Sequence, residues 1–321
     1  YVIRTVVFIM GSGHCGSTLL DLMLGSHSEA FSLGEIHRMG GPVDARIADS
    51  EARLCGVCAD RCEFWDSRAS EFWMRVFFSR ASIFRSMIRK SARYALSIYP
   101  FIMKWSDRRI VIDSSKSPGW IDHQLKPRYK WGDIRPVLIY LHRDGRAVTN
   151  SFLRKYPERG FEEIVNSWRR GAENMERYFS EFSRGPKLRV SYESLASNPE
   201  STMQAICEAL DLRYEPDMLR YWKHEHHHVF GNGGTRNLIY RYREQFEEPD
   251  RKLRDRIASA KQHYNHEYYD QIDVAIRLDE RWREELSPDQ LEQFDLIAGT
   301  ENAPYASTGE QAADRSLRLV Q

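Results

Sequence analysis

The sequence lacks any long hydrophobic run, and no segment approaches the roughly 20 consecutive apolar residues that a membrane-spanning helix needs. The pattern of a secretory leader, in which a basic stretch is followed by an apolar stretch and a cleavage site, is also missing from its start. We therefore expect no membrane partner.

An excess of charge of either sign is missing as well, since 47 Lys and Arg residues face 46 Asp and Glu residues, for a formal net charge of +1. This balance gives no bias toward nucleic acid, so we expect no nucleic-acid partner and infer that any anion site is local. Cysteine is scarce and its count of five is odd, which favours a reducing compartment and predicts a cytoplasmic location. The composition leaves the oligomeric state open.

What the sequence does contain is enough apolar material for a sizeable core, with 41% hydrophobic residues in a chain of 321. Its most informative stretch is residues 5–25, TVVFIMGSGHCGSTLLDLMLG. An apolar run with β-branched residues predicts a buried strand at residues 5–10, and leucines at helical spacing predict a helix from Ser17. A glycine-rich turn between a strand and a helix directs backbone N–H groups at a phosphate, although a tight connection without a ligand has the same pattern.

The spacing Gly11-x4-Gly16-x-Thr18 resembles a P-loop in which Ser17 replaces the lysine. The missing lysine indicates a phosphate cradle that does not act on a β/γ-phosphate pair. A P-loop kinase for small molecules is the alternative, and it would need a Mg²⁺ site for which Asp113 is the best candidate.

Further strands and helices alternate along the chain. Apolar runs predict strands at residues 31–33, 109–116, 136–142 and 187–195, and helical spacing predicts helices after Asp144, over 161–182 and from Asn198. This alternation predicts an α/β fold with a P-loop-like parallel sheet flanked by helices. Glu35 follows the strand at 31–33, at the carboxyl edge where ligands bind to parallel sheets.

We expect one domain over residues 1–300, with helical segments at 70–105 and 240–300. Residues 301–321 are small and polar and predict a flexible tail. The segments 38–105 and 224–245 are rich in Trp, Phe, Tyr and His and are candidates for the walls of a second substrate pocket.

Two groups of residues raise the question of a metal. Cys55, Cys58 and Cys62 are closely spaced, but no fourth ligand follows at suitable spacing, so buried thiols or a local disulfide are favoured over zinc. The histidine-rich run 224–228 lacks paired cysteines or regularly placed carboxylates. We therefore predict no metal site.

With these segments in place, the chain resembles the sulfotransferases that use 3′-phosphoadenosine-5′-phosphosulfate (PAPS), in particular the bacterial and tyrosylprotein-type branch. The most specific match is Arg143 at the end of a strand with Ser151 eight residues later, the arrangement with which that family binds the 3′-phosphate. The closing segment around Trp282 and Ser287 is also similar. The resemblance implies donor contacts from Gly13, His14, Cys15, Gly16, Ser17 and Thr18 at the 5′ end, Arg143 and Ser151 at the 3′-phosphate, Tyr192 near the adenine, and Asn232 and Arg236 in a late glycine-rich loop.

The same resemblance assigns the catalytic roles. Lys116 would stabilise charge in the transition state, and Glu35 would be the base, a role that a raised pKa would favour. His14 stands where the family usually has lysine or arginine, so a cation there is not guaranteed at neutral pH. The rival bases are His37, His123 and His228.

The sequence thus predicts in-line transfer of a sulfonate group from PAPS to a hydroxyl or amine, with no metal required. We expect a small-molecule acceptor with apolar or aromatic surface, while a sugar hydroxyl and a peptide tyrosine stay open. A non-catalytic nucleotide-binding module is the remaining alternative, in which Arg143 and Ser151 are needed but Glu35 and Lys116 are replaceable.

Overall fold

The computed structural model describes residues 3–40, 55–58, 62–68, 98–126, 134–246, 275–306 and 318–320. Several predicted features lie outside these residues, among them most of the expected helical segment at 70–105 and residues 247–274 of the expected helical segment at 240–300. The strands are β1 (Arg4–Met10), β2 (Ala30–Gly34), β3 (Ile110–Lys116), β4 (Ile134–His142), β5 (Lys187–Ser191) and β6 (Arg318–Val320). The helices are α1 (Ser17–Gly25), α2 (Glu63–Arg68), α5 (Tyr99–Ser106), α6 (Pro118–Gln124), α7 (Gly145–Lys155), α8 (Phe161–Glu181), α9 (Tyr192–Ser197), α10 (Pro199–Ala209), α11 (Gly233–Phe246), α14 (Trp282–Glu285) and α15 (Pro288–Asn302), with 3-10 turns η1 (Ile36–Gly40) and η2 (Pro216–Lys223).

The strands form one sheet in the order β2-β3-β1-β4-β5-β6. The first five are parallel, and only β6 runs antiparallel to its neighbour β5. Strand β1 lies in the middle and is buried from Thr5 to Met10, as expected for a parallel strand covered on both faces. The predicted α/β fold with a parallel sheet is therefore confirmed.

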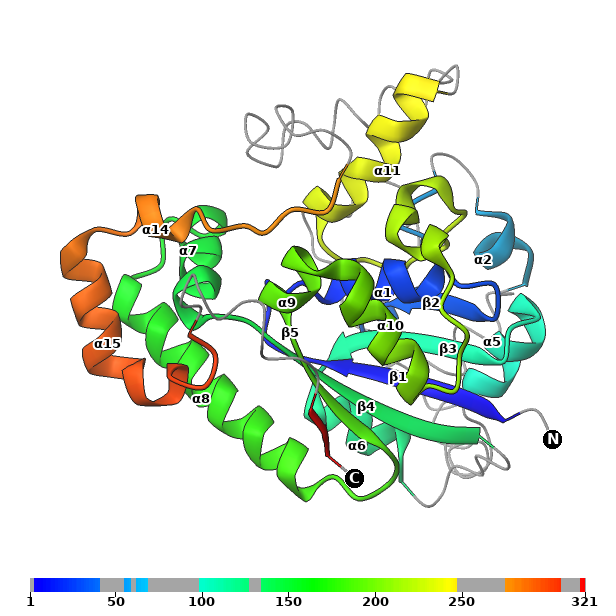
Figure 1. Ribbon diagram of the computed structural model, residues 1–321, viewed down its shortest axis with the longest axis horizontal. Coiled ribbons are helices and arrows are strands. Elements are labelled where there is room, and N and C mark those ends of the chain that lie inside the picture. The colour runs from blue at the N-terminus through cyan, green and yellow to red at the C-terminus, as the bar shows by residue number, and fades with distance from the viewer. Residues whose placement is uncertain are drawn as a thin grey trace, which may run out of the picture.

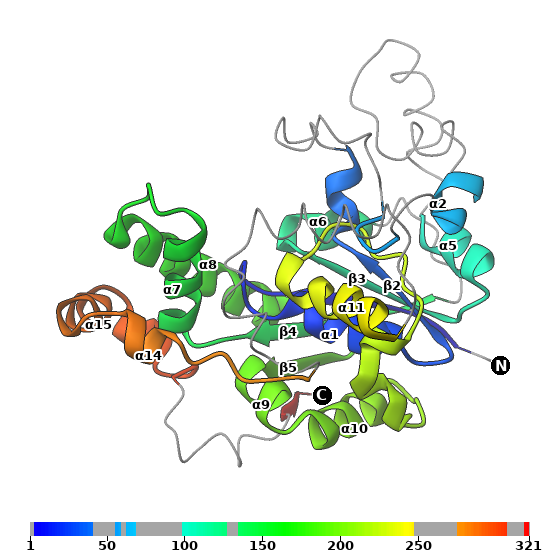
Figure 2. The same cartoon turned by 90° about the horizontal axis from the view of Figure 1, so that it is seen from above.

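Helices cover both faces of the sheet. Figure 2, seen from above, shows α1, α9 and α10 on one face and α5, α6 and α8 on the other. Helices α7, α14 and α15 gather at one end of the molecule beside α8 (Figure 1), where Trp168, Phe294 and Tyr305 form part of a smaller apolar cluster. No helix in the described part of the chain is long and apolar enough to cross a membrane.

The topology creates a crevice at the carboxyl edge of β1. The chain leaves β1 toward β2 on one side of the sheet, while β4 pairs with β1 on the other side. Ligands of open α/β sheets bind where the strand order reverses in this way. The loop after β1, the end of β3 and the turn after β4 meet at this edge and supply the polar residues considered below.

Three predicted boundaries were wrong. The strand expected over residues 187–195 ends at Ser191, because the Ser191 hydroxyl accepts the backbone N–H groups of Glu193 and Ser194 and starts α9. Helix α11 begins at Gly233, inside the expected glycine-rich loop. The chain also stays packed beyond residue 300, since α15 continues to Asn302 and Tyr305 is buried and donates a hydrogen bond to Glu176.

Candidate active site

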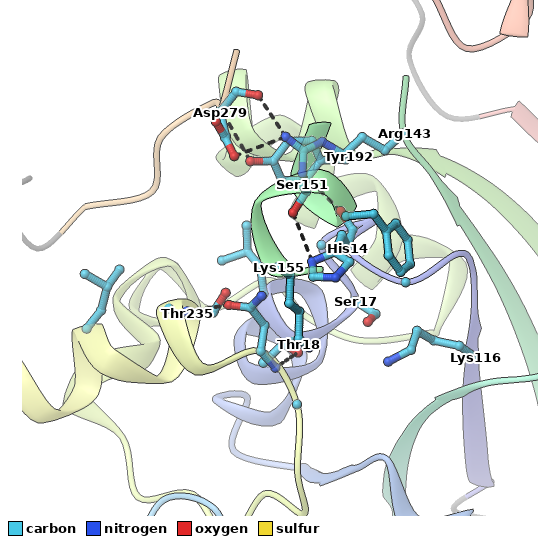
Figure 3. A pocket seen from close by; sticks show the side chains of 18 of the residues that line it. His14, Ser17, Thr18, Lys116, Arg143, Ser151, Lys155, Tyr192, Thr235 and Asp279 are labelled. Carbon is cyan, nitrogen blue, oxygen red and sulfur yellow. Dashed lines mark hydrogen bonds and ion pairs between the residues drawn. The ribbon is translucent and has the colours of Figure 1, made fainter. Parts of the chain in front are cut away.

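A cavity of about 310 Å³ opens at the carboxyl edge of β1, and Figure 3 shows side chains from the loop after β1, from α7 and from α11 pointing into it. The lining is strongly basic although the whole chain is almost neutral, which fits the expectation of a local anion site. Among the described residues its charged lining consists of seven basic side chains, Arg38, Lys116, Arg143, Arg154, Lys155, Arg277 and Arg281, and two carboxylates, Glu35 and Asp279.

The floor of the cavity is the turn between β1 and α1. Gly16 has a φ of +92°, and a Cβ at this position would lie 2.5 Å from the ring of Tyr192, so this close packing requires glycine. The first residues of α1, Ser17 and Thr18, line the cavity, and the backbone N–H groups of a first helical turn have no acceptor within the helix. Cys15 differs from its neighbours in the turn, because its side chain is fully buried and is not among the lining residues.

The late glycine-rich loop closes over this turn. The Asn232 backbone N–H donates to the Thr18 Oγ1 at 2.8 Å, and the Asn232 side chain accepts the Thr235 N–H at 3.1 Å. Both Asn232 and Thr235 line the cavity. The structure therefore brings together two predicted donor-binding segments that are more than 200 residues apart in the sequence.

Arg143 is held rigidly at the wall of the cavity. Its Nη1 donates to the His14 carbonyl at 3.0 Å and its Nη2 to the Asp279 carbonyl at 2.8 Å, while the guanidinium lies 4.2 Å from the centre of the Tyr192 ring. Its buried Nε has no hydrogen-bond partner among the described residues. An unpaired buried donor on a fixed guanidinium fits a site for a phosphate oxygen.

Asp279 places a carboxylate beside three arginines that line the cavity. Its carboxylate lies 2.8 Å from Arg281 Nε, 3.4 Å from Arg143 Nη2 and 3.6 Å from Arg154 Nη2. Burial alone would raise the pKa of Asp279, but the three guanidinium groups outweigh it and hold this pKa well below its ordinary value. No local pattern points to Asp279, because it lies 136 positions from Arg143 in the chain.

His14 does not supply a cation in this structure. Burial, followed by the positive charges of Lys155, Arg143, Lys116 and Arg154, lowers the pKa of His14 to about 3, so the ring is neutral at pH 7. Its Nδ1 lies 3.0 Å from the Ser151 hydroxyl. A cation that sequence reasoning missed lies beside it: Lys155 lines the cavity one helical turn after Ser151, and this four-residue spacing was the available signal.

Glu35 and Lys116 form the remaining wall. Lys116 Nζ donates to Glu35 Oε1 at 2.5 Å, and Arg38 lies 3.5 Å from the other carboxylate oxygen. Burial opposes the charge of Glu35, yet Lys116 prevails and lowers the pKa of Glu35 below its ordinary value. Glu35 therefore does not have the raised pKa that would favour a base, because the lysine predicted for another role is its ion-pair partner.

Comparison with known proteins bears on this geometry. The profile of the Sulfotransferase family matches residues 6–216. The chain belongs to the Sulfotransferase family. It is an enzyme of that family, and no curated protein sequence was found to match it.

Several solved structures are similar to this sulfotransferase at low sequence identity. The sulfotransferase domain of the olefin synthase from Synechococcus PCC 7002 is 18% identical, with a TM-score of 0.53 over 92% of this chain and 95% of that domain. The sulfotransferase domain of the curacin biosynthetic pathway is also 18% identical, with a TM-score of 0.48 over 70% of this chain and 80% of that domain. A Mycobacterium tuberculosis sulfotransferase is 15% identical, with a TM-score of 0.38 over 68% of this chain and 71% of that chain.

The sulfotransferase has a second cavity of about 310 Å³ next to the first. The two cavities share the lining residues Gly13, Glu35, Arg38 and Lys116. Among the described residues, the rest of the second lining comes mainly from the ends of β1 and β3. These further lining residues are Gly11, Ser12, His37, Ser115, Ser117, Pro118 and Met175. Most of the segment 38–105, expected to form the second substrate pocket together with 224–245, lies outside the described residues, so that expectation stays a prediction.

The rival bases of the sulfotransferase occupy different places. His228 is fully buried, has Nδ1 2.7 Å from the Ser32 hydroxyl, and lines neither cavity. His123 stacks on Trp120, also away from both cavities. His37 lines the second cavity, and burial as the largest cause lowers its pKa.

Arg236 is turned away from the first cavity. Its guanidinium donates to the carbonyls of Gly56 at 2.5 Å and Gly231 at 3.4 Å, and it is not among the lining residues. This placement gives no support to the donor contact that the resemblance implies for Arg236. The remaining predicted donor residues, from Gly13 to Asn232 and apart from Cys15, line one cavity.

Proposed function

We propose that this enzyme transfers a sulfonate group from PAPS to a hydroxyl or amine of a small molecule bound in the second cavity. The observation that carries the proposal is the junction of the two cavities at Glu35 and Lys116. A transferred group must pass from one substrate to the other at a shared wall that holds both a base and a cation. The closer kinship with tyrosylprotein-type members, for which Glu35 argues, is part of the same proposal.

The donor cavity offers a separate site for each end of PAPS. Arg143 and Ser151 would hold the 3′-phosphate, through the unpaired Nε of the arginine and the serine hydroxyl. The N-terminus of α1 with Ser17 and Thr18 would hold the 5′ end. Tyr192 offers an aromatic face in the same lining.

PAPS when bound supplies the activated sulfonate and its phosphate leaving group. Lys116 would donate to the negative charge that develops during transfer, and Lys155 and the N–H groups of α1 would add to the positive field. Glu35, which its lowered pKa keeps ionised at neutral pH, accepts the proton of the acceptor hydroxyl or amine. Arg38, paired with Glu35, limits the directions in which this carboxylate can turn.

Asp113, the candidate Mg²⁺ ligand of the kinase alternative, is engaged in other contacts. The Asp113 Oδ2 accepts hydrogen bonds from the Tyr99 hydroxyl at 2.6 Å and from Trp120 Nε1 at 2.8 Å, and Asp113 lines neither cavity. A carboxylate engaged in this way is not placed to hold Mg²⁺ against a bound nucleotide.

The experiment is a thermal-shift titration with 3′-phosphoadenosine 5′-phosphate (PAP), the product that remains after transfer, beside ATP with Mg²⁺. At about 100 times its dissociation constant a ligand that binds only the folded state adds roughly 2.7 kcal/mol of stability. We expect stabilisation by PAP alone, its loss in Arg143→Ala, and its retention in the control Arg159→Ala, whose half-buried arginine pairs with the exposed Glu163 and does not line the cavity. Stabilisation by ATP with Mg²⁺ alone would contradict the proposal.

A further inference from the structure

Four side chains that belong to neither cavity come together beside β2. The Sγ atoms of Cys55, Cys58 and Cys62 and a ring nitrogen of His227 all lie within 4.8 Å of one another. The His227 Nδ1 is 3.4 Å from Cys58 Sγ and 3.3 Å from Cys62 Sγ. None of the five cysteines, all within the described residues, forms a disulfide, so of the two expected alternatives, thiols or a local disulfide, the structure has thiols.

The backbone around Cys55 is shaped to support a thiolate. The N–H groups of Val57 and Cys58 both point at Cys55 Sγ, at 3.4 and 3.3 Å. Two donors converging on one sulfur stabilise its charged form and fix its direction. Cys55 and Cys62 are each 4% exposed, so the sulfurs are gathered inside the protein and not on its surface.

His227 is oriented as a ligand from both sides of its ring. Its Nε2 lies 3.2 Å from a carboxylate oxygen of Glu225, which leaves Nδ1 to face the sulfurs. The Phe64 ring stacks on it with centroids 5.2 Å apart, and Trp65 Nε1 donates to the His227 carbonyl at 2.6 Å. A carboxylate on the outer nitrogen is the usual partner of a metal-bound histidine, because it fixes the tautomer.

We propose that Cys55, Cys58, Cys62 and His227 bind one zinc ion in a closed tetrahedral site. Three sulfurs and one imidazole nitrogen are a donor set that favours zinc, and four protein ligands leave no open position for catalysis. In such a site a sulfur and a nitrogen ligand lie about 3.6 Å apart, close to the separations observed here. Binding releases the thiol protons to solvent, forms the metal–ligand bonds and involves no oxidation.

The cysteine cluster is connected to two parts of the chain near the first cavity, helix α11 and the backbone next to Glu35. The Gly56 carbonyl accepts hydrogen bonds from Arg236 and Tyr240, both on α11. Cys55 forms a β-bridge with Val229, whose carbonyl in turn accepts the Glu35 N–H at 2.8 Å. Zinc would therefore hold together the loop that carries Asn232 and the backbone that positions Glu35.

The first test measures the metal content of the full chain purified without chelators, by mass spectrometry of its metals. We expect one zinc per chain. Replacement of zinc by Co²⁺ should give the intense absorption of tetrahedral thiolate-bound cobalt, a readout that needs no mutation and is independent of sulfotransferase activity.

Variants then locate the ion. Cys58→Ser with Cys62→Ser should lose zinc and the cobalt absorption, and Glu225→Gln should weaken zinc binding by about 10- to 100-fold. Cys207→Ala and His224→Gln are matched controls that remove a buried cysteine and a histidine outside the cluster, and both should retain one zinc.

Two results would overturn the proposal. One is wild-type protein that, fully reduced, contains neither zinc nor bound cobalt, or that contains iron instead of zinc. The other is full zinc content in the double cysteine variant.

Discussion

Glu35 combines burial with a charge that its neighbours preserve. Lys116 at 2.5 Å and Arg38 at 3.5 Å keep its pKa below the ordinary 4.5 in spite of burial. We predict that Glu35→Gln lowers the rate of sulfonate transfer by about 10²- to 10⁴-fold, the usual contribution of a general base. The measurement is the transfer rate at saturating PAPS, beside PAP affinity, which should stay unchanged.

The sign of the pH dependence follows from the same shift. A base with a lowered pKa stays ionised as pH falls to that pKa, so the acid limb of the wild-type rate should lie below about pH 4.5. Glu29→Gln is the control, because it removes a half-exposed glutamate that also pairs with an arginine. An acid limb well above pH 4.5 would contradict Glu35 as the base.

Among the elements, the turn between β1 and α1 is the most constrained. Gly16→Ala places a Cβ in a left-handed backbone and 2.5 Å from Tyr192. We expect a loss of more than about 1 kcal/mol of unfolding free energy, together with weaker PAP binding, because Tyr192 must move. Chemical denaturation and PAP titration measure the two effects.

A matched glycine provides the control for this turn. Gly160 precedes α8 with a φ of −67°, and a Cβ there would meet no atom within 4 Å. Gly160→Ala should leave stability and PAP binding nearly unchanged. Equal effects of the two substitutions would contradict the packing argument.

The helices and strands that the sequence predicted correctly are those that depend on local patterns. The buried strands and the Asp144 cap of α7 could be predicted because apolar runs and capping side chains act over a few residues. The end of β5 at Ser191 was missed since the run of strand-forming residues continues past its cap. Lys155 had a signal in its spacing, whereas Asp279 and His227 reach their partners only through the tertiary fold.

At the scale of the whole molecule, Asp21 ties the first helix to the sheet. Its Oδ2 accepts the Gly34 N–H at 3.1 Å and the Ser114 hydroxyl at 2.5 Å, and so links α1 to β2 and β3. Burial is the largest cause that raises the pKa of Asp21 to about 7, and Asp113 adds to it. The folded-state pKa thus exceeds the ordinary 3.8 of an aspartate.

The raised pKa predicts how stability changes with pH. The protonated Asp21 contributes stability that is fully present below about pH 4 and is lost as pH rises through about 7. Relative to wild type, Asp21→Asn should therefore gain unfolding free energy over this range, on the order of a few kcal/mol. Denaturation at several pH values checks this, with the exposed Asp107→Asn as control. A difference that does not vary with pH would refute it.

The α/β architecture could be predicted because each strand and each helix carries its own pattern, and the order of elements then leaves few topologies. The meeting of the two cavities at Glu35 and Lys116 could not be predicted from the sequence. These two residues are 81 positions apart, and only the sheet brings them together. For the same reason the sequence did not predict His227 as the fourth ligand of the cysteine cluster, since it lies 165 positions from Cys62.

Asp279 gives the donor cavity a further property. Two of the three Arg143 nitrogens already face the backbone or carboxylate of the chain itself, so an arriving phosphate meets an occupied guanidinium. The free energy that the phosphate gains at Arg143 is therefore the difference between its own attraction to the guanidinium and that of the Asp279 carboxylate. It is smaller than the attraction to a guanidinium without a carboxylate partner. The cavity therefore favours ligands whose phosphate binds Arg143 more strongly than the Asp279 carboxylate does. Sequence changes at residues 275–281, several of which line the cavity beside Arg143, can change donor affinity while Arg143 itself stays the same.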